Sequence, residues 1–157
     1  MPKLFALLLV LSVLGTVPTQ AQGTLRLPDT TLATTDAAAV PVGAEGLSGS
    51  DIFSWQFEVR YDPAVLDTVT VEAQGTLAEG RRMSANTTRR GRLSVAVAGT
   101  APVEPGSPLL ILRVHPAAPG RTPLAWESAQ FNEGTPEART VDGRVTVVPS
   151  DTTDAPQ

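Results

Sequence analysis

Alternation between apolar and polar side chains is the main pattern of this chain. The clearest example is residues 52–61 (IFSWQFEVRY). Five apolar or aromatic side chains there fall in one phase: Phe53, Trp55, Phe57, Val59 and Tyr61. Successive side chains of a strand point to opposite faces of a sheet, so the pattern predicts a strand with one buried face. Asp62-Pro63 is expected to end this strand, because proline cannot donate a hydrogen bond to a neighbouring strand.

Shorter segments with the same alternation follow one another along the chain, separated by Gly, Pro, Asp or Asn. They cover residues 24–27, 38–42, 65–71, 82–88, 93–98, 108–114, 124–131 and 139–148. Nowhere do apolar residues keep the period of a helix for three turns. The pattern predicts an all-β fold, a β-sandwich of about nine strands with jelly-roll topology.

Two of these segments carry specific expectations about the core. Trp126 is in phase with Leu124, so its ring is expected to be buried, like that of Trp55. In the last segment three valines share a phase around the turn pair Asp142-Gly143: Val141, Val145 and Val147.

The N-terminus has the pattern of a secretory signal peptide. Lys3 precedes an apolar run over residues 4–15, and a small and polar stretch leads to Ala21, after which cleavage is expected. The apolar run is shorter than the roughly 20 residues that span a bilayer, and no second run exists that could span one. We therefore predict a signal peptide at 1–21, one domain at 22–148 and a flexible C-terminal tail at 149–157. The mature protein is expected outside the cytoplasm, extracellular or periplasmic.

Composition excludes several classes of function. The chain has no Cys and one His, which excludes disulfide scaffolds, thiol nucleophiles and multi-His metal centres. A net charge of −4 disfavours nucleic-acid binding, which needs clustered positive charge. Neither Ser94 nor Ser107 lies in a Gly-x-Ser-x-Gly elbow, His115 is the only imidazole, and the carboxylates are scattered. We expect no enzyme activity, no cofactor and no metal.

Strand exteriors are the remaining candidates for a binding site. The outward phase of residues 52–61 is Ser54, Gln56 and Glu58, and that of residues 93–98 is Ser94, Ala96 and Ala98. If the two strands are neighbours, they form a flat, weakly polar patch that suits another protein better than a small ligand. Arginines flank the weak strand at 82–88: Arg81, Arg82, Arg89, Arg90 and Arg92. We expect them to mark a charge-protected sheet edge, and a polyanion site is the alternative.

The segment from Phe53 to Leu66 (FSWQFEVRYDPAVL) resembles the F-x-x-x-YDP-x-x-L strand and turn of bacterial cohesin domains. Later segments follow in the family's order: residues 93–99, 108–114, 131–134 and 142–145. The resemblance spans roughly residues 25–148. It implies the nine-stranded jelly roll that cohesins share with certain cellulose-binding modules, and a partner that carries a dockerin, a small Ca²⁺-loop domain.

The resemblance also implies where such a partner binds. Ser54 and Gln56 stand where other cohesins carry an Asn and an Asp, Thr88 stands near a Tyr, and Gly99 stands near an acidic residue. With the outward residues above, the candidate partner-binding set is Ser54, Gln56, Thr88, Ser94, Ala96 and Gly99. The calcium of such complexes belongs to the dockerin.

The sequence therefore predicts a secreted, non-catalytic recognition module, acting as a monomer, that binds a dockerin-type or other extracellular protein in polysaccharide degradation. Two alternatives stay open. One is direct polysaccharide binding, which the shared fold favours and the expected burial of both Trp residues opposes. The other is a structural role in an envelope or secreted assembly.

Overall fold

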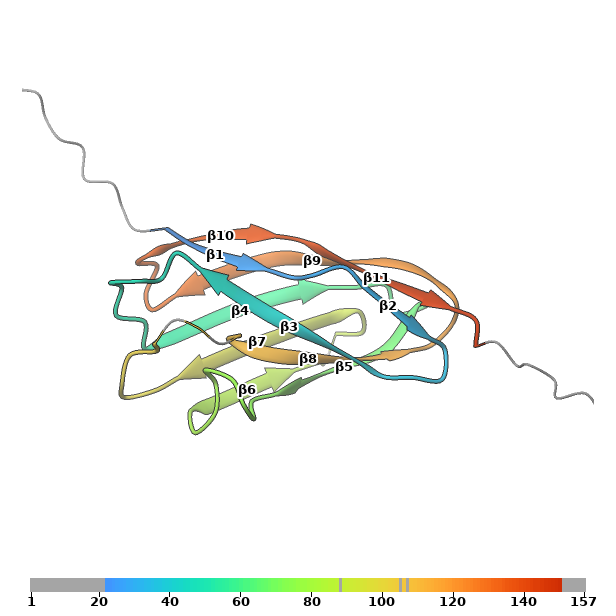
Figure 1. Ribbon diagram of the computed structural model, residues 1–157, viewed down its shortest axis with the longest axis horizontal. Coiled ribbons are helices and arrows are strands. Elements are labelled where there is room, and N and C mark those ends of the chain that lie inside the picture. The colour runs from blue at the N-terminus through green and yellow to red at the C-terminus, as the bar shows by residue number, and fades with distance from the viewer. Residues whose placement is uncertain (1–21, 88, 105, 107, 151–157) are drawn as a thin grey trace, which may run out of the picture.

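The computed structural model describes residues 22–150, except 88, 105 and 107, as two packed β-sheets (Figure 1). The smaller sheet has the order β10 (Glu137–Val141), β1 (Gln22–Arg26), β3 (Ala38–Glu45), β8 (Leu110–Pro116) and β5 (Leu66–Glu72). The larger sheet has the order β2 (Thr30–Ala33), β11 (Gly143–Val148), β9 (Gly120–Phe131), β4 (Ser54–Arg60), β7 (Arg92–Ala98) and β6 (Arg82–Asn86). The predicted all-β sandwich is confirmed, with eleven strands rather than nine.

Two differences explain the higher strand count. The polar stretch at Thr30–Ala33 forms β2, and the expected strand at 139–148 is two strands, β10 and β11, in different sheets. The pair Asp142-Gly143 is thus not a hairpin turn but the point where the chain passes from one sheet to the other.

The two ends of the domain run side by side and change sheet together. β10 pairs in parallel with β1, and β11 pairs in parallel with β2, as Figure 1 shows along the upper edge of the molecule. At the crossing, Gly143 approaches the backbone of Leu27 and Pro28 so closely that an added Cβ would lie 2.7 Å from the Pro28 carbonyl oxygen. Only glycine fits there.

The alternation of β4 packs one face of that strand into the core. Trp55, Phe57, Val59 and Tyr61 are all buried, as the sequence predicts. Phe53 was predicted to join them and does not: its side chain is 40% exposed, while Ile52 is fully buried. The strand begins only at Ser54, so the alternation of β4 does not extend back to Phe53.

Two other core predictions need correction. Val141 is 36% exposed, because it ends β10 at the edge of the smaller sheet. Trp126 is only partly buried: its ring packs edge-on against Phe57, with ring centroids 5.2 Å apart. Its indole Nε1 donates to the Val141 carbonyl, which fixes the ring at the rim of the sandwich.

The predicted boundaries at both ends of the chain fall partly outside the described residues. The signal peptide at 1–21 and residues 151–157 of the expected tail lie outside them. The structure does describe the start of the tail, where the Ser150 backbone N–H donates to Thr34 Oγ1 over 3.2 Å. In the described part of the chain, no helix is long and apolar enough to cross a membrane.

Candidate functional site

β4 and β7 are neighbours, so their outward side chains form one surface. In the antiparallel register Ser54 lies opposite Ala98, Gln56 opposite Ala96, and Glu58 opposite Ser94. Directly opposite residues project to the same face of a sheet. The patch that the sequence predicts for these two strands is therefore present on the outer face of the larger sheet.

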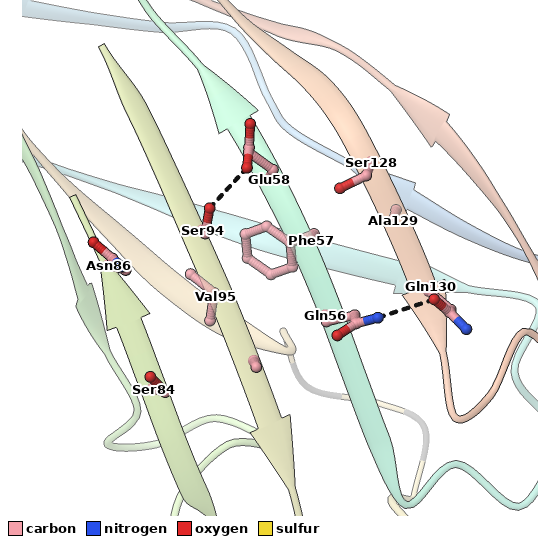
Figure 2. A pocket seen from close by; sticks show the side chains of 11 residues that line it. Gln56, Phe57, Glu58, Ser84, Asn86, Ser94, Val95, Ser128, Ala129 and Gln130 are labelled. Atoms are coloured by element: carbon pink, nitrogen blue, oxygen red, sulfur yellow. Dashed lines mark hydrogen bonds between the residues drawn. The ribbon is translucent and has the colours of Figure 1, made fainter. Parts of the chain in front are cut away.

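β6 and β9 extend this surface on both sides (Figure 2). Ser84 and Asn86 of β6 lie opposite Ala96 and Ser94, so they continue the same cross-strand rows. On the other side Gln56 Nε2 donates to Gln130 Oε1 of β9 over 2.9 Å. We call the outer surface of β6, β7, β4 and β9 the docking face.

The middle of the docking face is a shallow trough. Two adjoining depressions of about 400 Å³ each follow it and share Gln56, Ser84 and Ala96. The trough exists because β7 contributes only the short side chains of Ala96 and Ala98 between longer ones on either side. Its floor is uncharged and offers no deep cavity of the kind that encloses a small ligand.

At one end of the trough, charged side chains form a ladder across three strands. The Glu58 carboxylate accepts a hydrogen bond from Ser94 Oγ and another from Arg92 Nη1, each over 2.8 Å. Arg92 also contacts Glu127 of β9, and Arg60 Nε lies 3.1 Å from Glu127 Oε1. The register shift between Glu58 and Val59 leaves Glu127 as the extra residue of β9, which allows both arginines to reach it.

These contacts favour the charged form of Glu58. The hydrogen bond from Ser94, and next the one from Arg92, lower the pKa of the Glu58 carboxyl below its ordinary value. Glu58 is thus a paired carboxylate that links β4 to β7.

The structure brings four of the six predicted site residues together. Ser54, Gln56, Ser94 and Ala96 lie on the docking face. Thr88 lies outside the described residues. Gly99 sits at the end of β7 beneath the Arg81 guanidinium, where any Cβ would collide with that group.

Sequence reasoning missed the contributions of β6 and β9 to the face: Ser84, Asn86, Ser128 and Gln130. The alternation of residues 82–86 does place Ser84 and Asn86 in one phase. Which strand lies beside β7 depends on sheet order, and alternation within a segment carries no information about that.

The arginines around β6 divide into two groups. β6 is the edge strand of the larger sheet, as the flanking charges predict. Arg81 turns inward: its Nη2 donates to the Ala101 carbonyl over 2.7 Å, and its guanidinium lies over the ring of Trp55. By contrast, Arg82, Arg89 and Arg90 are exposed.

Within the described residues, no three His, Asp or Glu side chains gather as a metal site. Among the same residues, the exposed large hydrophobic side chains are Phe53, Met83, Val141 and Val148. Phe53 is the one aromatic residue among these four. A single exposed ring does not form a coplanar row of rings.

Comparison with known proteins shows which family the chain belongs to. The model of the cohesin domain family matches residues 23–110. The chain is similar in structure to the cohesin CaCohA2 from Clostridium acetobutylicum, with a TM-score of 0.71 and 17% identity over 82% of this chain and 92% of that one. No curated protein sequence matches it.

Two further solved structures share the fold. The type I cohesin–dockerin complex Coh-OlpA–Doc918 from Clostridium thermocellum gives a TM-score of 0.66 and 19% identity, over 81% of this chain and 99% of that one. A non-cellulosomal cohesin from the archaeon Archaeoglobus fulgidus gives a TM-score of 0.66 and 15% identity, over 83% of this chain and 94% of that one. The family match covers more than half of the chain, and this chain is therefore a member of the cohesin family.

Proposed function

We propose that this chain is a secreted, non-catalytic recognition module that binds a dockerin-type protein partner in polysaccharide degradation. The observation that carries the proposal is the docking face, a shallow trough with an uncharged middle on the larger sheet of a cohesin-family domain. Structural relatives that were solved as cohesin–dockerin complexes support it.

The shape of the trough favours a protein over a small molecule. A protein partner buries about 800 Å² on each side of a standard interface and needs a broad surface without projecting side chains. Ala96 and Ala98 leave room for such contact across β4, β7 and β6.

We further propose that residues 1–21 are removed on export, that 22–148 act as a monomeric domain, and that 149–157 are a tail outside it.

The test is affinity capture with residues 22–157 from the culture supernatant of the source organism, with Ca²⁺ and with chelator. Captured proteins are identified by mass spectrometry. We expect a protein with paired Ca²⁺-binding loops, lost on chelation because such a domain folds only with its metal. Capture that is insensitive to chelator points to a different protein ligand, and retention on insoluble polysaccharide without any captured protein supports direct glycan binding instead.

A matched pair of variants locates the contact. Ala96→Trp fills the trough, whereas Ala39→Trp places the same ring on an exposed alanine of β3, on the opposite sheet. We expect Ala96→Trp to weaken binding of the captured partner by about tenfold or more, and Ala39→Trp to leave it unchanged. Equal binding by both variants would remove the docking face from the proposal.

A further inference from the structure

The charge on the larger sheet has the opposite sign to that of the whole chain. The chain carries a net charge of −4. The six strands of the larger sheet nevertheless hold five arginines and two acidic residues: Arg60, Arg82, Arg92, Arg121 and Arg144 against Glu58 and Glu127. The remaining acids lie on the smaller sheet, in loops and near the termini.

Both acidic residues of this sheet are already paired. Glu58 is held by Arg92 and Ser94, and Glu127 by Arg60 and Arg92. Neither carboxylate is therefore left to neutralise an arginine elsewhere on the docking face.

Three arginines along the β6 edge remain. The exposed side chains of Arg82, Arg89 and Arg90 make no ion pair or hydrogen bond with any described residue. Arg82 lines the trough beside Ala98. Arg89 lines a depression of about 270 Å³ at the other end, together with Asn86, Arg92, Ser94 and Glu58, whose carboxylate is paired with Arg92.

Arg82 begins β6, and Arg89 follows the last residue of that strand, Asn86, in the chain. Arg82 lies opposite Ala98 and Asn86 opposite Ser94, so the two ends of β6 are about 13 Å apart along the strand. The uncharged floor at Ala96 lies between them. Guanidinium groups bind carboxylates through paired hydrogen bonds, and complementary charge at a rim sets partner choice and association rate.

We propose that the docking face binds an acidic surface of its protein partner, with carboxylates of the partner at Arg82 on one end of the trough and at Arg89 on the other. The inference rests on the proposed function for the location of the face, and it adds the charge of the partner. It predicts a partner whose contact surface is rich in Asp and Glu and carries small uncharged side chains over Ala96.

The test uses poly-L-glutamate as an acidic probe and poly-L-glutamine of similar length as the neutral control. Residues 22–157, which hold both sheets, are labelled with ¹⁵N and titrated at low salt. We expect poly-glutamate to shift the amide signals of residues 82–98 and to lose this effect at high salt, because exposed charges are screened there. Shifts confined to the smaller sheet, or equal shifts with the neutral peptide, would overturn the proposal.

A double variant, Arg82→Glu and Arg89→Glu, tests the named side chains. We expect it to bind poly-glutamate about tenfold more weakly. The control is Arg139→Glu, an exposed arginine of β10 on the other sheet, which should change the affinity by no more than about twofold. All three positions are exposed, and thermal unfolding checks that each variant is folded.

Two further outcomes separate this inference from the proposed function. Tighter binding of polygalacturonate than of poly-glutamate at the same residues would assign the face to an anionic polysaccharide and overturn the acidic-protein proposal. If Ala96→Trp blocks binding of the captured partner but the double variant binds it as tightly as the parent chain, the proposed function stands and the charge inference fails. If nothing is captured, the peptide titration still decides the charge of the face.

Discussion

Glu58 shows how one side chain on the docking face is held in a single state. Its two carboxylate oxygens accept from Ser94 Oγ and Arg92 Nη1, and these bonds lower its pKa. A carboxyl group with a depressed pKa stabilises the fold at pH values above its unfolded pKa, and this contribution is lost as the pH falls through the folded pKa.

The residue-scale prediction is a pH-dependent effect of Glu58→Gln. Above the ordinary glutamate pKa of about 4.3 the variant should melt at a lower temperature than the parent chain. The difference should shrink under more acidic conditions, because the parent carboxylate is then protonated as well. Thermal unfolding followed by circular dichroism, repeated at pH values above and below this pKa, measures the difference in melting temperature. Glu133→Gln, an exposed loop carboxylate, is the control, and a Glu58→Gln effect that stays constant with pH would contradict the argument.

At the scale of elements, one loop residue fixes the start of β4. Asn132 follows β9, and its Oδ1 accepts from the backbone N–H groups of Phe53 and Ser54 over 2.9 and 3.2 Å. Its Nδ2 donates to the carbonyl oxygens of Asp51 and Thr135. Asn132 also has a positive φ of 45°, which asparagine tolerates better than most residues. The side chain thus ties the loop before β4 to the loop after β9.

We predict a graded loss of stability at this position. Asn132→Ala removes all four hydrogen bonds and places alanine at a positive φ, so it should lower the free energy of unfolding by about 2 kcal/mol or more. Asn132→Asp keeps the acceptor oxygens and loses the donors, so it should fall between the parent and the alanine variant. Urea unfolding ranks the three chains. Equal stability of the aspartate and alanine variants would contradict this ranking.

At the scale of the whole molecule, the two ends of the domain close the sandwich together. β1 leads into β2 and β10 leads into β11, and each pair passes from the smaller to the larger sheet. The two passages lie against each other at Gly143. The arrangement requires a close backbone approach that a larger residue would block.

Gly143→Ala should therefore destabilise the fold. The new Cβ would lie 2.7 Å from the Pro28 carbonyl oxygen and 2.8 Å from Leu27 Cβ. This segment between β1 and β2 cannot move aside cheaply, because the Leu27 N–H donates to the Val141 carbonyl. We expect a loss of about 1–3 kcal/mol in the free energy of unfolding, measured by urea denaturation. Gly43→Ala is the matched strand control, because its nearest neighbour would be at an ordinary 3.6 Å. Similar losses in both variants would mean that the crossing is not the cause.

Much of the docking face could be predicted from the alternation of residues alone. The outward phase of β4 and β7 follows from the period of two, and it identifies Ser54, Gln56, Ser94 and Ala96 correctly as surface positions. The same reasoning failed at Phe53, because it extended a regular strand into residues that are not part of β4.

The sequence by itself determined the class of fold, the segments that form most strands, and which side chains of β4 and β7 point outward, because these depend on local periodicity. Tertiary structure decided the sheet order, and with it the trough between β4 and β6 and the pairing of Glu58 with Arg92. It also decided that 139–148 divides between two sheets. These features depend on contacts between residues far apart in the chain, such as Gly143 with Pro28, and no pattern within a segment specifies its distant neighbours.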